Sequence, residues 1–95
     1  MGSRKLSIAS ASVIVPGNPQ NANYNSSLAR VVCPPGKVAL SVSTHWNEFR
    51  DHLELSTVSA RITVDAKGRP KGGEARGASN VPGDRVFTVY VLCAG

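Results

Sequence analysis

The chain has few aromatic residues and no long hydrophobic run. It contains two phenylalanines, two tyrosines and one tryptophan among its 95 residues. No stretch approaches the roughly 20 consecutive apolar residues of a membrane-spanning helix, so we expect no membrane segment. The apolar run from Leu6 to Val15 is interrupted by serines. It therefore indicates a strand rather than an export signal, and we expect the protein to be made in a cytoplasm.

Groups that carry chemistry are also scarce. His45 and His52 are the only imidazoles, and their spacing does not match a known set of metal ligands. Two prolines follow Cys33, rather than the helix N-terminus that would lower the pKa of a catalytic thiol. The glycine-rich segment lacks the Lys-Ser/Thr and the helix of a phosphate-binding loop. We therefore predict that the protein is not an enzyme and uses no cofactor or metal.

Helical periodicity is missing, and short strand-like runs separated by proline, glycine and asparagine take its place. Strands are expected at 6–15, 28–33, 37–46, 53–64 and 85–93. Alternation within 37–46 places Val38, Leu40, Val42, Thr44 and Trp46 on one side of a half-buried antiparallel strand. A change of parity near Ser56 and Thr57 indicates a bulge or a tight turn. The last run is apolar on both faces near its end, which predicts a central position in a sheet. The sequence thus predicts one all-β domain over 1–95, a small antiparallel β-sandwich or barrel of six to seven strands.

Residues 67–84 hold five glycines and two prolines, and predict one long loop. This loop is either a flexible surface segment or an arm that orders against a neighbouring molecule. It also concentrates basic residues, and Arg69, Lys71 and Arg76 are the candidates for contacting a partner. The chain has a net charge of +5, which favours an acidic partner. No aromatic side chains for base stacking lie among these basic residues, which argues against nucleic acid.

The chain has two cysteines, and each ends a strand-like apolar run. A Cys33–Cys93 disulfide would tie the C-terminal strand to the rest of the domain. It would close a loop of about 60 residues and add about 4 kcal/mol of stability by restricting the unfolded chain. We predict this bond. The alternative is a pair of buried free thiols, since cysteine packs as a small hydrophobic residue.

A single tryptophan, Trp46, stands among polar residues at the end of a predicted strand. With His45, Asn47 and Arg50 it could form a carbohydrate-binding surface, because an indole ring stacks on sugars. The alternative role of Trp46 is to cover one end of the hydrophobic core.

Three short motifs resemble those of a known group of proteins. They are Ser-Val-Ile-Val-Pro-Gly-Asn near the start, Cys-Pro-x-Gly-Lys-Val-x-Leu from Cys33, and Val-Tyr-Val-x-Cys-Ala at the end. This order is similar to that of small β-domains at the ends of collagen-like and fibre-like proteins of bacteria and their phages, which also occur as stand-alone phage virion proteins. In that group Cys33 and Cys93 would match the paired cysteines. The chain departs from the group at Ser41-Val42-Ser43, where a glycine run is usual.

The resemblance implies a non-enzymatic structural protein of a phage virion, made in the cytoplasm of a host bacterium. We expect a capsid decoration or minor capsid protein that binds the assembled shell. Its partners would be the major capsid protein or other virion proteins, and it would form a homo-oligomer, with a trimer favoured. Arg69, Lys71 and Arg76 would then pair with acidic capsid residues. The alternative function is a carbohydrate- or surface-binding adhesion domain of a fibre-like protein.

Overall fold

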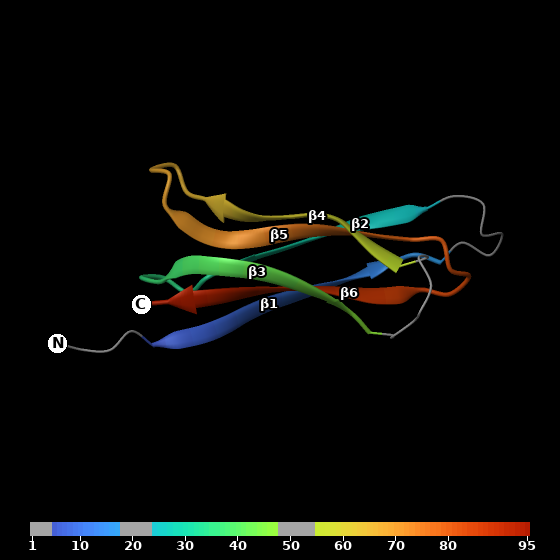
Figure 1. The fold of residues 1–95 in the computed structure, drawn as a ribbon, viewed down its shortest axis with the longest axis horizontal. Coiled ribbons are helices and arrows are strands. Elements are labelled where there is room, and N and C mark those ends of the chain that lie inside the picture. Colours follow the sequence, from blue (N-terminus) through green and yellow to red (C-terminus); the bar gives the residue numbers. More distant parts are fainter. Residues whose placement is uncertain (1–4, 18–23, 48–54) are drawn as a thin grey trace.

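The chain folds into two antiparallel sheets that lie against each other (Figure 1). The computed structural model describes residues 5–17, 24–47 and 55–95. One sheet has the strand order β1-β6-β3 and the other has the order β2-β5-β4. The six strands are β1 (Leu6–Val15), β2 (Asn25–Val32), β3 (Val38–Trp46), β4 (Leu55–Val64), β5 (Pro70–Ser79) and β6 (Arg85–Ala94). The predicted all-β sandwich is confirmed, and no helix in the described ranges is long and apolar enough to cross a membrane.

The hydrophobic core is centred on β6, which lies between β1 and β3 as predicted. Every second residue of β6 points its side chain toward the second sheet. Three of these side chains have no exposed surface, namely those of Phe87, Val89 and Val91. Val15, Ala29 and Ala75 complete the central cluster around Phe87 and Val89. Alternation along β6 therefore supplies one wall of the core, and the strands of the second sheet supply the other.

The prediction of one long loop over 67–84 is wrong, because Pro70–Ser79 forms β5, the middle strand of the second sheet. Two of its glycines, Gly73 and Gly77, are positions of close approach to β6 rather than signs of flexibility. A Cβ atom at Gly77 would lie 2.6 Å from Cγ of Phe87, and one at Gly73 would lie 2.7 Å from a methyl carbon of Val91. Small residues on β5 thus accommodate the large residues of β6. The segment is a central strand, so it is not an arm.

The alternation predicted along β3 is also partly wrong. Leu40 was expected on the core side with Val42 and Trp46, but its side chain is 50% exposed, whereas Ala39 is 5% exposed. The cause is a register shift in the pairing of β3 with β6 between Ala39 and Ser41, which reverses the parity of the strand. A similar shift in β4 lies between Thr57 and Ser59, close to the change of parity expected from the sequence.

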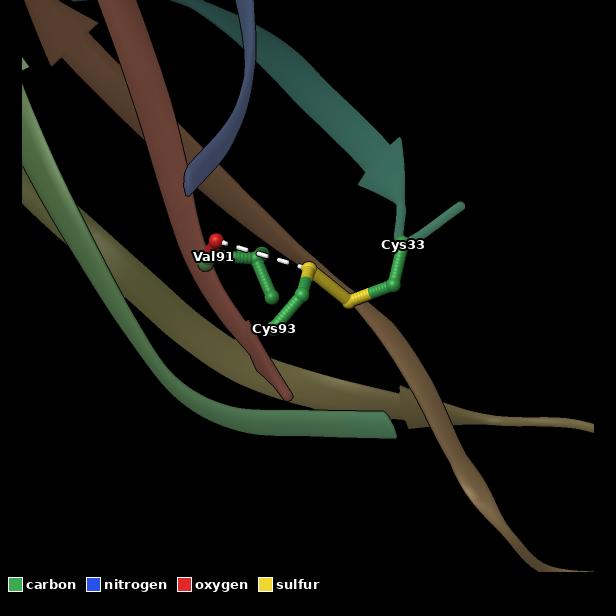
Figure 2. Close-up of a disulfide and its surroundings, with 3 residues drawn as sticks. All are labelled: Cys33, Val91 and Cys93. Carbon is green, nitrogen blue, oxygen red and sulfur yellow. Dashed lines mark hydrogen bonds between the residues drawn. A yellow bond between two sulfur atoms is a disulfide. The ribbon is translucent and has the colours of Figure 1, made fainter. Parts of the chain in front are cut away.

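A disulfide joins Cys33, just after β2, to Cys93 on β6 (Figure 2). The Cα atoms lie 5.8 Å apart, and neither cysteine is free. Sγ of Cys93 lies 3.6 Å from the carbonyl oxygen of Val91, a packing contact, since a disulfide sulfur carries no proton. The bond links the two sheets near the C-terminal end of the chain.

Candidate binding surface: a cationic sheet face

Basic side chains gather on the outer face of the second sheet, the face turned away from the core. Glu74 on β5 lies directly opposite Arg30 on β2 and Arg61 on β4, and opposite residues in an antiparallel sheet share a face. Arg76 follows Glu74 by two residues and lies on the same face. Lys71 lines the same pocket as Arg30, Arg61 and Glu74. We name this surface, formed by Arg30, Arg61, Lys71 and Arg76 around Glu74, the cationic face.

Glu74 holds two arginines in place. Nη2 and Nε of Arg30 lie 2.7 and 2.8 Å from Oε2 of Glu74, and Nε of Arg61 lies 2.7 Å from Oε1. The residue Glu74 is 8% exposed, whereas the side chains of Arg30 and Arg61 are 62% and 74% exposed. The hydrogen bonds from Arg61 and then Arg30 hold the pKa of Glu74 below its ordinary value. The carboxylate therefore stays ionised at neutral pH and orients two guanidinium groups at the surface.

An open pocket of about 310 Å³ lies against this group. Arg30, Arg61 and Lys71 line it together with apolar side chains, namely Val32, Ile62 and Val64. A guanidinium carries five N–H donors in a fixed fork, and its contacts with Glu74 occupy part of them. The remaining donors suit the planar oxygens of a carboxylate, which arginine binds in a bidentate manner. The arrangement suits binding of an acidic group, with apolar contact at its side.

Charge is distributed unequally between the two sheets. Neither β1 nor β3 contains a lysine, arginine, aspartate or glutamate, and within β6 Arg85 is the one charged residue. The outer face of the β1-β6-β3 sheet is therefore uncharged along most of its length. Most of the positive charge carried by the six strands therefore lies on the cationic face of the other sheet.

The structure separates the three partner-binding residues expected from the sequence. Lys71 and Arg76 belong to the cationic face, and Nη1 of Arg76 lies 3.2 Å from Oγ of Ser26. Arg69 instead lies in the turn between β4 and β5, with its Nε 3.1 Å from Oδ2 of Asp65. Hydrogen bonds from backbone N–H groups of this turn, first that of Arg69, lower the pKa of Asp65. Asp65 and Arg69 therefore close the turn between β4 and β5.

Sequence reasoning missed Arg30 and Arg61. Arg30 is 44 residues from Glu74 in the chain, and Arg61 is 13 residues from it. Each arginine looks like an isolated exposed charge within an apolar strand. The signal that unites them is the pairing register of β2 and β4 with β5. That register was hidden because β5 itself was not expected to be a strand.

The residues suggested for carbohydrate binding do not converge in the described part of the chain. The ring of Trp46 packs against that of Phe87, with centroids 4.9 Å apart and planes at 50°. His45 is the preceding residue of β3, and so points to the opposite side of the sheet. Oδ1 of Asn47 accepts a hydrogen bond from the backbone N–H of Val86 at 3.0 Å. Arg50 lies outside the described residues.

Comparisons with protein-family models, with curated proteins and with solved structures found no match to this chain. Among the residues that the structure describes, no group of three histidines, cysteines, aspartates or glutamates is placed to hold a metal ion. The cationic face is therefore the surface feature on which a function can best be argued.

Proposed function

We propose that the protein is a non-enzymatic structural protein that binds an acidic surface of a larger assembly through its cationic face. The assembly that fits both the resemblance and the charge is the shell of a phage virion, with the protein as a decoration or minor capsid component. The observation that carries the proposal is the pair Arg30 and Arg61, oriented at the surface by Glu74. Opposite it lies a sheet whose outer face is almost free of charge.

Pre-orientation makes this face suited to binding. Long basic side chains lose conformational entropy when a partner immobilises them. Arg30 and Arg61 are already restrained by hydrogen bonds to Glu74, so less of that entropy remains to be lost. The positive field also accelerates the encounter with an acidic surface. An oligomer that contacts several sites of a repeating shell at once would bind with an avidity above the affinity of a single site.

Carbohydrate binding has less support from the geometry. The ring of Trp46 faces Phe87 in the core, and the side-chain amide of Asn47 is hydrogen-bonded to the backbone of Val86. A sugar platform at this end of β3 would need the indole face to be open. We therefore favour the cationic face as the binding surface.

The test is co-sedimentation with assembled empty capsids of tailed phages, at low and at moderate salt. The R30Q/R61Q variant should bind at least ~10-fold more weakly than the wild type, because charge-assisted contacts are lost. The K5Q/K67Q variant removes the same net charge from exposed positions outside the face and should bind like the wild type. Circular dichroism of each variant verifies that it is folded. Equal binding by both variants, or no binding of the wild type at low salt, would contradict the proposal.

A further inference from the structure

Among the four edge strands that the structure describes, β1 lacks the features that protect sheet edges from pairing with other chains. The register of β3 is interrupted by a bulge, and that of β4 is interrupted twice. Arg30 lies within β2, and Arg61 lies within β4. By contrast, β1 pairs with β6 over ten residues without a shift, and it contains neither proline nor charge. Its first half forms the lower left margin of the molecule in Figure 1.

The backbone of β1 directs alternate groups toward this open edge. The N–H of Gly95 donates to the carbonyl oxygen of Lys5 at 3.2 Å, so Lys5 and each second residue after it face β6. The even-numbered residues therefore point their N–H and C=O groups outward. The carbonyl oxygen of Ile14 accordingly accepts a hydrogen bond from Oγ of Ser27 at 2.8 Å.

The outward backbone groups nearer the start of β1 have no such cover. The structure places no hydrogen-bond partner from the described residues on them; they belong to Leu6, Ile8, Ser10 and Ser12. The side chains of Leu6 and Ile8 are also 63% and 61% exposed. This half of β1 is thus an exposed, uncharged edge whose outward donors and acceptors are not bonded to any residue that the structure describes.

We propose that a second copy of the chain covers this edge, with β1 pairing antiparallel to β1 of the partner subunit about a two-fold axis at Ala9. In this register Leu6 lies opposite Ser12 of the partner subunit, and Ile8 lies opposite Ser10 of the partner subunit. The open groups on each copy then match those on the other. Each such pair exchanges two hydrogen bonds, so about eight would form across the axis.

The composition of β1 suits a second copy as the occupant, because both of the paired strands would be uncharged. The net charge of +5 on each chain opposes self-association, and pairing through β1 keeps that repulsion small. Lys5 of one copy and Lys5 of the partner subunit would lie at opposite ends of the paired strands, about 26 Å apart. That separation exceeds the Debye length of about 8 Å at physiological salt.

The pairing would join two nearly uncharged sheets into one six-stranded sheet and leave both cationic faces outside it. The closed assembly is a two-fold dimer, rather than the trimer that the resemblance implied. Its formation does not depend on shell binding, so the two proposals can fail separately.

Sedimentation velocity of the full chain over a range of concentrations tests the dimer. Ser10 faces away from β6, so S10P removes an outward N–H without breaking a bond within the sheet. This variant should raise the dimer dissociation constant about 30-fold, the effect of one hydrogen bond lost from each copy. S10K is a second variant, because an edge lysine opposes pairing, and the two introduced charges would lie about 7 Å apart.

S43K is the matched control, since Ser43 lies on the same sheet but on its opposite edge strand. It should dimerise like the wild type. Residue-resolved hydrogen exchange should also show that the amides of Ile8 and Ser10 become protected as concentration rises. A wild type that stays monomeric near 1 mM, amides that exchange freely at every concentration, or equal disruption by S43K and S10K would overturn the proposal. So would a monomer whose capsid binding is abolished by S10P, because β1 would then pair with a different protein.

Discussion

Adding one methyl group at Gly77 should destabilise the protein, although alanine usually stabilises a chain relative to glycine. The new Cβ atom would lie 2.6 Å from Cγ of Phe87 and 2.8 Å from Cζ2 of Trp46. Carbon atoms in good contact are about 3.5–4.0 Å apart, so roughly 1 Å of separation must be gained. Phe87 has no exposed surface. Its ring therefore has no open space to move into, and the sheets must separate locally.

The size of this effect follows from two opposing contributions. Overpacking a core costs about 1–3 kcal/mol. Replacing glycine restricts the unfolded chain, which stabilises the folded protein by about 0.4–1 kcal/mol. The net loss for Gly77→Ala is therefore about 1–2 kcal/mol. In a domain of this length that loss corresponds to a fall in Tm of about 5–15 °C.

Urea denaturation of Gly77→Ala, Phe87→Leu and the double variant measures the effect and its cause. Leucine is smaller than phenylalanine and leaves room for the added methyl group. The double variant should therefore be more stable than the sum of the two single losses implies, by at least ~0.5 kcal/mol. A Gly77→Ala variant as stable as the wild type, or additive losses, would refute the close approach of β5 to β6 as the reason for glycine.

Two further predictions concern the disulfide and Glu74. The Cys33→Ala/Cys93→Ala variant should lose about 4 kcal/mol in urea denaturation, because the bond closes a loop of about 60 residues; a loss below ~1 kcal/mol would contradict this. Since folding lowers the pKa of Glu74, its stabilising effect should be complete above pH 4.5, its ordinary value, and be lost as the pH falls below that. Thermal melts should therefore show a weaker acid dependence for Glu74→Gln than for the wild type, with the remainder due in part to Asp65; an unchanged dependence would exclude the role of Glu74.

Strands with an apolar pattern could be predicted from the sequence, and β5 could not. The span expected for β1 agrees with Leu6–Val15, and the last strand was expected in the centre of its sheet. These segments carry their own signal, because their side chains are buried wherever they pair. In β5 the reason for Gly73 and Gly77 lies in another strand, since their small size matches the bulk of Val91 and Phe87. The glycine-rich composition of this segment therefore predicted a loop, although the segment is the central strand of a sheet.

The candidate site was only partly predictable for a related reason. Lys71 and Arg76 were identified as candidates because basic residues cluster near them in the sequence. Arg69 was included for the same reason. The structure pairs Arg69 with Asp65 in a turn. Arg30 and Arg61 meet through their common neighbour Glu74. Proximity that depends on strand register cannot be found from linear spacing until the strand order is known.

The most direct test of the central claim is to label lysines in the protein bound to capsids and to compare their rates with those of the free protein. Lys71 lines the pocket of the cationic face, whereas Lys5 and Lys67 are exposed elsewhere and serve as internal controls. Binding through the cationic face predicts slower acetylation of Lys71 by amine-reactive reagents, with unchanged rates at Lys5 and Lys67. Bound protein in which Lys71 reacts at its free rate while Lys5 or Lys67 is protected would contradict the account.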